Sequence, residues 1–305
     1  MSTAIQRAID AVSTVVLGKE DQIRLAVACL LARGHLLIED LPGMGKTTLA
    51  HALARVFGLD YRRVQFTSDM LPADILGVSV FDPDSREFQL RPGPVFAQLL
   101  LADEINRATP KTQGALLEAM EERQVTLDGV SRPLPEPFFV IATQNPVTQA
   151  GTFPLPESQL DRFLMRISLG YPSAKTELAL LAGSDRRGEA LALAPVLEGA
   201  SLQQWMARVD AVHASSDLID YIQRLLAHSR HSGLFVVGLS PRAGLGLLRA
   251  ARAWALTVGR DFVSPEDVQV VLEPVTAHRL QGSAGGATAS STQRLLEAVP
   301  VVRRG

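Results

Sequence analysis

The most constraining feature of this 305-residue sequence is a short apolar segment that enters a glycine-rich turn and then a helical pattern. The apolar segment is His35-Leu-Leu-Ile-Glu-Asp40, and the glycines of the turn end at Gly45. The residues in helical phase after the turn are Leu49, Leu53, Val56 and Phe57. Strand, glycine turn and helix form the first half of a βαβ unit, so we expect an α/β fold with a parallel sheet.

The turn matches the phosphate-binding loop pattern, with the sequence Asp40-Leu-Pro-Gly-Met-Gly-Lys-Thr47, except that Asp40 replaces the first glycine. Gly43 and Gly45 let backbone N–H groups curl around a phosphate, and the following helix N-terminus attracts the same anion. Lys46 is expected to reach the outer phosphates, and the Thr47 hydroxyl to coordinate Mg²⁺. The structural alternative is a glycine-rich turn with a chance Lys-Thr pair.

Two further apolar strands end in polar residues. Leu99-Leu-Leu-Ala-Asp-Glu104 ends in adjacent carboxylates, whose side chains diverge at a strand tip. We expect Asp103 to hold Mg²⁺ through water and Glu104 to polarise an attacking water. Val140-Ile-Ala-Thr-Gln-Asn-Pro146 places Asn145 at the carboxyl edge of the sheet, where it could orient that water or contact a phosphate. An ordinary acidic pair and a turn cap before Pro146 are the structural alternatives.

The rest of the chain divides into a first domain that alternates strands with helices, a helical second domain and a tail. Two helices, at 5–16 and 21–32, precede the first strand, and further strands are expected at 64–67, 98–102 and 138–143. Turn residues at 82–85 and at Asp128-Gly129 predict two β-hairpin insertions, near 78–90 and 124–134. After Tyr171-Pro172, helices are expected at 175–182, 202–212, 218–229, 241–258 and 265–278. The predicted domains are therefore 1–171, an all-α domain at 172–281, and a flexible tail at 282–305 with a linker-like composition.

Composition excludes several classes of protein. The net charge of −2 provides no chain-wide positive field for nucleic acid or an anionic membrane, so neither nucleic-acid binding nor membrane insertion is expected. No apolar run approaches the roughly 18 residues that a transmembrane helix needs. The single cysteine, Cys29, cannot form an internal disulfide, which fits a reducing compartment. We therefore expect a soluble cytoplasmic protein.

Five motifs in chain order carry a family resemblance. They are Asp40-Leu-Pro-Gly-Met-Gly-Lys-Thr-Thr48, Leu101-Ala-Asp-Glu-Ile-Asn-Arg-Ala108, Ala142-Thr-Gln-Asn-Pro146, Leu155-Pro-Glu-Ser-Gln-Leu-Asp-Arg-Phe163 and Leu239-Ser-Pro-Arg242. Together they resemble the MoxR family of AAA+ ATPases over roughly residues 15–280. The resemblance implies a P-loop NTPase core with an all-α lid, ATP and Mg²⁺ as cofactors, and a homo-oligomeric ring, usually a hexamer, with nucleotide between subunits. The two hairpins match the family's helix-2 and pre-sensor-1 insertions, which point toward the ring pore or a bound partner.

The resemblance also implies roles for individual residues. The ATP-binding loop is Pro42, Gly43, Met44, Gly45, Lys46, Thr47 and Thr48, and Leu17 with Gly18 occupies the place of the adenine pocket. Asp103 with Glu104 is Walker B and Asn145 is sensor 1. Arg162 is the arginine finger, because a fixed guanidinium can neutralise charge on the transferring phosphoryl group. Arg242 is sensor 2, and Arg107 is a rival for the finger.

The function that the resemblance implies is chaperone-like remodelling or maturation of partner proteins or metalloenzyme complexes. A von Willebrand factor A domain protein is the expected partner, together with a protein client. Two other readings stay open, a magnesium chelatase-like ATPase subunit and a nucleic-acid-linked motor. The absence of a helix-turn-helix domain, a basic tail and a net positive charge counts against the motor.

Overall fold

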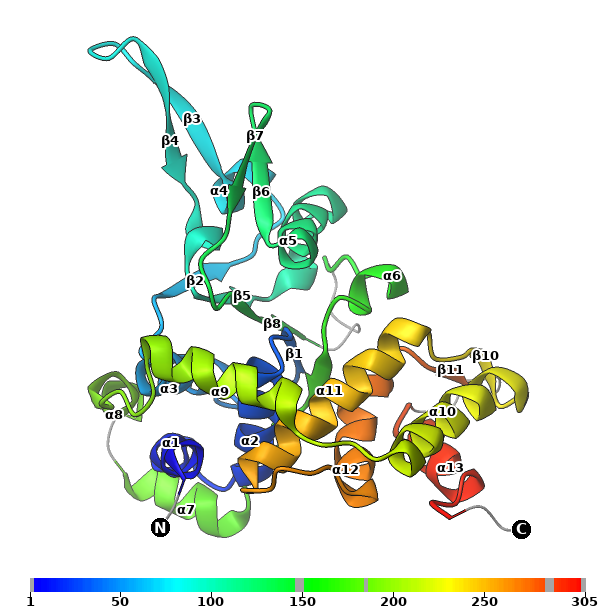
Figure 1. Ribbon diagram of the computed structural model, residues 1–305. Helices are drawn as coiled ribbons and strands as arrows, with labels where there is room; N and C mark the ends of the chain where they lie inside the picture. Colours follow the sequence, from blue (N-terminus) through cyan, green and yellow to red (C-terminus); the bar gives the residue numbers. More distant parts are fainter. Residues whose placement is uncertain (1–2, 146–150, 184–185, 283–287, 303–305) are drawn as a thin grey trace.

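The computed structural model describes residues 3–145, 151–183, 186–282 and 288–302. A sheet covered by helices forms the core, a helical lid packs beside it, and two β-hairpins project together from one end of the molecule (Figure 1). Among the described residues, no helix is both long and apolar enough to cross a membrane.

The core sheet has five parallel strands in the order β2-β5-β8-β1-β9. The strands are β1 (Leu36–Glu39), β2 (Tyr61–Gln65), β5 (Leu99–Asp103), β8 (Phe139–Gln144) and β9 (Met165–Ile167). Every residue of β5 and β8 is buried, as expected for central strands covered on both faces. The predicted strand at 64–67 begins earlier, at Tyr61, because β2 is an edge strand whose polar residues hide it from an apolar pattern search.

Helices cover both faces of this sheet. They are α1 (Ala4–Ser13), α2 (Glu20–Leu31), α3 (Lys46–Val56), α4 (Pro72–Leu76), α5 (Pro110–Glu122) and α6 (Glu157–Leu160), with the 3₁₀ turns η1 (Pro94–Phe96) and η2 (Ile105–Arg107). Along β5, Leu99 and Leu101 join the hydrophobic core shared with α1, α2 and α3. The alternate residue Leu100 joins a second core beneath α5. The pleat therefore divides the apolar side chains between two layers, as the βαβ pattern predicts.

Both predicted hairpins are confirmed. The first pairs β3 (Gly77–Asp82) with β4 (Glu87–Pro92), and the second pairs β6 (Gln124–Leu127) with β7 (Val130–Pro133). Gly77 has a φ of +97°, and a Cβ at this position would lie 2.4 Å from the carbonyl oxygen of Arg91. Glycine is therefore required at the base of the first hairpin.

The lid consists mainly of helices, and capping serines begin several of them. The helices that follow β9 are α7 (Ala174–Ala182), α8 (Arg186–Ala192), α9 (Gly199–Ala211), α10 (Ser216–His231), α11 (Pro241–Thr257) and α12 (Pro265–Thr276). Side chains of Ser215 and Ser240 cap α10 and α11, and Ser264 with Asp267 forms a capping box on α12. The expectation of an all-α domain is wrong in one detail. Strands β10 (Phe235–Val237) and β11 (Gln281–Gly282) form a small ribbon, too short to leave a periodic signal.

The C-terminal tail is not a flexible segment over its described part. Residues Thr288–Ala298 form α13, which packs on α10 and α12. The Leu295 side chain is fully buried, and Arg224 donates hydrogen bonds to the carbonyl oxygens of Pro300 (2.6 Å) and Val301 (2.7 Å). The apolar pair Leu295-Leu296 is the signal in the sequence for such a docked element, although the tail as a whole has the composition of a linker. Residues 283–287 of the predicted linker lie outside the described residues.

His35 joins three elements of the core. Its Nε2 donates a hydrogen bond to the carbonyl oxygen of Met120 at the end of α5 (3.3 Å), and its Nδ1 accepts one from the Val140 N–H of β8 (3.0 Å). Burial lowers the pKa of His35 from 6.5 to about 4. The folded protein therefore contains His35 with a neutral imidazole ring.

This pKa predicts a pH dependence of stability. As pH falls below about 6.5, the unfolded chain protonates His35 while the folded chain resists, so stability is lost between about pH 6.5 and pH 4. The shift corresponds to about 3 kcal/mol. We expect His35→Gln, which keeps hydrogen-bonding groups but does not titrate, to lose less stability than wild type between pH 7.5 and pH 4. Urea denaturation at both pH values measures this, and equal losses in the two proteins would contradict it.

Candidate functional site

The glycine-rich turn forms an open loop between β1 and α3. Gly43 (φ +84°) and Gly45 (φ +89°) adopt left-handed backbone conformations, and no atom lies within 4 Å of the place where a Cβ would stand. Gly45 caps the N-terminus of α3, whose first residue is Lys46. The Lys46 ammonium donates hydrogen bonds to the carbonyl oxygens of Asp40 (2.6 Å) and Leu41 (3.3 Å). The loop therefore combines open space, a helix N-terminus and a buried ammonium, which suits phosphate.

Asp40, the departure from the loop pattern, has a structural explanation. One carboxylate oxygen accepts hydrogen bonds from the backbone N–H groups of Leu169 and Gly170, both at 2.7 Å, and from the Ser168 hydroxyl at 3.1 Å. The other accepts from the Leu41 N–H at 2.9 Å. Asp40 thus ties the loop to the segment that leaves β9, a contact that the sequence motif does not reveal.

A cavity of about 210 Å³ adjoins the loop. It is lined by Val15, Val16, Leu17, Lys19, Gly43, Met44, Gly45, Thr48, Gly170, Pro172 and Leu180. A lining that combines apolar side chains with the loop glycines suits a nucleotide base and its phosphates. The predicted residue Gly18 lies just outside this lining, where a Cβ would stand 2.8 Å from the Thr176 hydroxyl. Pro42 is exposed and Thr47 half-buried, and neither is among the described lining residues.

The predicted acidic pair lies at the carboxyl end of β5. Asp103 Oδ1 accepts a hydrogen bond from the Thr143 hydroxyl (2.6 Å), and Asp103 Oδ2 pairs with the Arg63 guanidinium (2.7 Å). The same Thr143 oxygen accepts a hydrogen bond from the Glu104 N–H at 2.9 Å. Thr143 and Arg63 were not predicted from the sequence. The strand order, which places β5 between β2 and β8, is what brings them to Asp103.

Glu104 and Asn145, which were each expected at a strand end, lie in contact. The Asn145 Nδ2 donates a hydrogen bond to Glu104 Oε1 at 3.2 Å, although the residues are 41 positions apart in the chain. Arg107 pairs with Glu104 Oε2 at 2.8 Å. The carboxylate is thus held from both sides at the carboxyl edge of the sheet. Arg107, the rival arginine finger, lies beside the Glu104 of its own chain.

The charges around Lys46 and the nearby oxygen atoms suit a magnesium nucleotide. Burial lowers the pKa of Lys46, and the carboxylates of Asp40, Asp103 and Glu104 oppose that shift. Thr47 and Asp103 offer the hydroxyl and carboxylate oxygens that Mg²⁺ prefers, and such sites are normally completed by phosphates and water. Within the described ranges there is no group of three or more histidine, cysteine or acidic side chains that would hold a metal alone.

Arg162 and Arg242 lie away from this loop. Both pair with Glu121, near the end of α5, through Arg162 Nε (3.0 Å) and Arg242 Nη1 (2.7 Å). This shared pairing is the reason why the pKa of the Glu121 carboxyl is lowered, with the hydrogen bond from Arg242 as the largest cause. Neither arginine is among the described residues that line the cavity.

The surroundings of this pair place it at the amino edge of the sheet. Met120, beside Glu121, contacts His35, and the Leu164 N–H donates a hydrogen bond to the His35 carbonyl (2.9 Å). His35 precedes β1, whereas Asp40 follows it, so the two residues are about 17 Å apart at about 3.3 Å per residue. The predicted site residues therefore form two groups at opposite edges of the sheet.

Comparisons with known proteins agree with this architecture. The signature described as "ATPase family associated with various cellular activities (AAA)" matches residues 35–165, and the signature "AAA lid domain" matches residues 227–299. The second match covers all of α13, which supports including this helix in the lid.

Several relatives match nearly the whole chain. "Uncharacterized protein YeaC" of Bacillus subtilis is 44% identical over 90% of this chain and 86% of the relative. "Chaperone MoxR1" of Mycobacterium tuberculosis is 40% identical over 90% of this chain and 75% of the relative. The crystal structure of a putative ATPase from Cytophaga hutchinsonii matches 98% of this chain and 95% of that chain. The TM-score is 0.88 and the sequence identity is 34%.

Proposed function

This chain belongs to the MoxR family of AAA+ ATPases, and we propose that it acts as a ring that couples ATP hydrolysis to the remodelling of partner proteins. The observation that carries the proposal is the separation of the site residues. The phosphate-binding loop, Asp103 and Glu104 lie at the carboxyl edge of the sheet, whereas Arg162 and Arg242 lie at the amino edge. One chain thus holds two halves of a site that do not meet within it.

A head-to-tail assembly brings the two halves together. When the amino edge of one subunit faces the carboxyl edge of the next, each interface gains one complete site, and repetition of such a contact closes a ring. Arg162 is 27% exposed and Arg242 is 55% exposed, so both side chains are accessible to a neighbour. We infer that Arg162 is the arginine finger and that both arginines serve the nucleotide of the adjacent subunit.

Within one interface the roles divide as follows. Lys46 and the loop N–H groups would bind the phosphates, and Thr47 with Asp103 would hold Mg²⁺, which neutralises phosphate charge. Glu104, oriented by Asn145, would polarise the attacking water. A guanidinium from the neighbour would stabilise the charge that develops on the transferring phosphoryl group. Arg107, which contacts Glu104 in its own chain, would help to hold that carboxylate in place.

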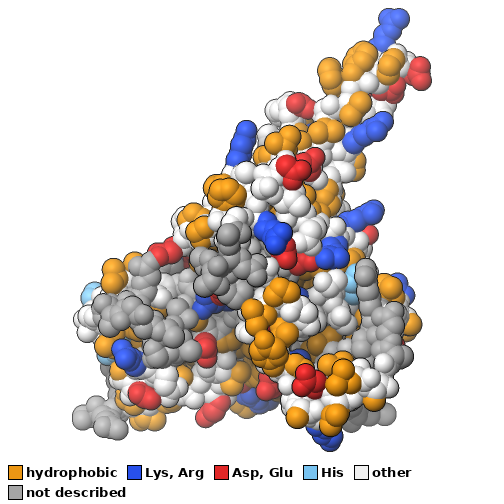
Figure 2. Space-filling model, turned by 180° about the vertical axis from the view of Figure 1, so that it is seen from behind, with side chains coloured by type: hydrophobic (Ala, Val, Ile, Leu, Met, Phe, Trp, Pro, Cys, Tyr) orange, Lys and Arg blue, Asp and Glu red, His pale blue; other side chains and the backbone are white. Residues whose placement is uncertain are grey.

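The projecting β3–β4 hairpin supports a partner-binding role. Phe81 and Phe88 stack edge to face with ring centroids 5.5 Å apart, and they are 50% and 73% exposed. Figure 2 shows the arm extending far from the body, with hydrophobic side chains along it among charged ones. Exposed apolar patches rimmed by polar groups mark protein-interaction sites. We propose that this hairpin contacts a von Willebrand factor A domain protein or a client.

The hairpin proposal predicts a separation of activities. We expect Phe88→Ser to keep the basal ATP turnover, because the residue lies far from the nucleotide loop, and to lose most of the change in turnover caused by a purified von Willebrand factor A domain partner. Val236→Ser is the matched control, since Val236 is 70% exposed on the lid ribbon. Steady-state turnover with increasing partner concentration measures both variants, and equal responses would contradict the proposal.

The two other functions are tested with the same assay. Strong stimulation of turnover by single- or double-stranded DNA would favour a nucleic-acid motor, which the net charge of −2 does not support. A magnesium chelatase-like subunit shares the architecture, and it would instead respond to the other subunits of such an enzyme.

A further inference from the structure

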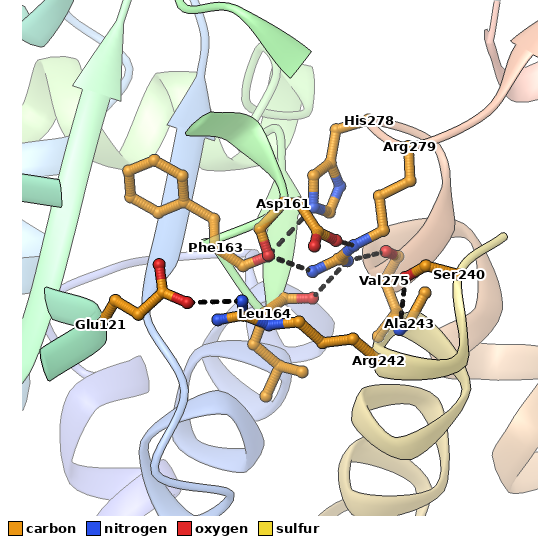
Figure 3. Close-up of polar contacts among 10 residues, drawn as sticks. All are labelled: Glu121, Asp161, Phe163, Leu164, Ser240, Arg242, Ala243, Val275, His278 and Arg279. Atoms are coloured by element: carbon orange, nitrogen blue, oxygen red, sulfur yellow. Dashed lines mark hydrogen bonds and ion pairs between the residues drawn. The ribbon is translucent and has the colours of Figure 1, made fainter. Parts of the chain in front are cut away.

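Arg279 is a buried arginine that the roles above do not use. It follows α12 at the end of the lid helices, and its side chain is only 8% exposed. Figure 3 shows it reaching from the lid into the segment of the core that precedes β9, close to the Glu121–Arg242 pair. Burial lowers the pKa of Arg279, whereas the hydrogen bond to Asp161 opposes that shift. The buried guanidinium charge of Arg279 therefore needs hydrogen-bond acceptors within the protein.

All five N–H groups of the Arg279 guanidinium have acceptors. Nε donates to the Asp161 carboxylate (2.6 Å), and Nη2 donates to the carbonyl oxygens of Asp161 (3.0 Å) and Phe163 (2.6 Å). Nη1 donates to the carbonyl oxygen of Leu164 (3.2 Å) and to that of Val275, in the last turn of α12. Four of the five bonds thus end on residues 161, 163 and 164.

A second residue of the lid also forms a hydrogen bond to this segment of the core. The His278 Nε2 donates a hydrogen bond to the Phe163 carbonyl oxygen at 3.0 Å, so this oxygen accepts from two side chains. The Phe163 side chain is itself fully buried in the core beneath α5. The backbone on both sides of Arg162 is therefore fixed, while the Arg162 side chain pairs with Glu121 and is 27% exposed.

We propose that Arg279 is a positioning residue for Arg162, which holds the finger segment rigidly on the lid so that the Arg162 guanidinium is presented to the neighbouring subunit. This inference rests on the proposed role of Arg162 as a finger in trans. The finger segment is bonded to the end of α12 and also to the core, through the buried Phe163 ring and the Leu164 N–H. It therefore ties the lid to the edge of the core at the place where Arg162 is held.

The geometry explains why arginine is required here. The planar guanidinium spans a carboxylate and several carbonyl oxygens at once, whereas a lysine ammonium has three donors at a single point. Arg279→Lys keeps the charge and much of the apolar stem but cannot reach all of these acceptors. The expected consequence is that Arg162 is held less rigidly. Misplacement of a catalytic group by about 1 Å can lower the rate about 10²-fold.

The test measures ATP turnover in mixed rings. We expect Arg279→Lys alone to bind ATP as wild type does but to show a kcat about 10²-fold lower, with KM little changed. Mixed with Glu104→Gln, which has an intact finger and lacks the general base, it should recover activity that neither variant has alone. The matched control is Arg260→Lys, which alters another arginine–aspartate pair of the lid, with Asp267, that does not contact residues 161–164. This control should keep its turnover.

The outcomes separate this inference from the proposal on which it rests. Arg162→Ala is mixed with Glu104→Gln in parallel. If that mixture recovers but the Arg279→Lys mixture does not, or if Arg279→Lys keeps wild-type turnover, the positioning role is wrong and the finger stands. If the Arg162→Ala mixture does not recover, both ideas fail. Should Arg279→Lys not fold, Asp161→Ala, which removes the one carboxylate partner, takes its place with the same expected recovery.

Discussion

A Glu104→Gln variant is expected to bind ATP with the affinity of the wild-type protein and to hydrolyse it about 10² to 10⁴ times more slowly. Glutamine has nearly the same shape and can keep the contact with the Asn145 amide, but it does not accept a proton from water. Nucleotide titration gives the affinity, and steady-state phosphate release gives the rate. Turnover at the wild-type rate would show that Glu104 is not the general base.

Lys46→Ala is the matched contrast, because its effect should fall on binding. Its ammonium lies within the phosphate-binding loop, 2.6 Å from the Asp40 carbonyl, and nothing else in the described loop supplies a positive side chain. We expect this variant to lose ATP binding, whereas Lys111→Ala, at an exposed position on α5, should bind normally. An unchanged ATP affinity in Lys46→Ala would show that this loop does not bind the nucleotide.

Much of this site could be predicted because its residues follow the strands in a fixed order. Glu104 and Asn145 each come directly after a buried apolar strand, and Lys46 follows β1 after the glycine-rich turn. Parallel strands bring their carboxyl ends to one edge of the sheet. The local pattern was therefore sufficient to expect Glu104 and Asn145 at strand ends, but not the hydrogen bond between them. The two hairpins followed from turn chemistry alone.

The contacts that were missed depend on which strands are neighbours. Thr143 and Arg63 reach Asp103 only because β8 and β2 lie on either side of β5. The pairing of Asp40 with the N–H groups after β9 has the same origin. No periodicity in one sequence encodes strand order, and the short helix α13 was hidden for a related reason, because few apolar residues form its buried face.

Arg162→Ala is the second variant with a large expected effect. The arginine lies at the edge of the sheet opposite the phosphate-binding loop of its own chain, so its loss should leave that chain's ATP binding intact. Removal of a transition-state arginine lowers the rate by about 10³ to 10⁵. We therefore expect a variant that binds nucleotide, assembles and barely hydrolyses. A decrease in ATP affinity within isolated subunits would contradict this assignment.

Arg107→Ala gives the comparison for the rival residue. Arg107 pairs with Glu104 of the same chain, so its loss should act on the site of its own subunit. Mixing Arg107→Ala with Glu104→Gln should then recover no activity, because every site in the mixture would lack either Arg107 or Glu104 of its own chain. Recovery in this mixture, and not in that with Arg162→Ala, would transfer the finger role to Arg107.

The most direct test of a site shared between subunits is the ATP turnover of an equimolar mixture of Arg162→Ala and Glu104→Gln, after labelled protein has confirmed that subunits exchange. In randomly mixed rings about a quarter of the interfaces join an intact Glu104 to an intact Arg162. We predict turnover of about that fraction of the wild-type rate, far above either parent. If turnover stays at the parental level at every mixing ratio, Arg162 does not complete the site of a neighbouring subunit.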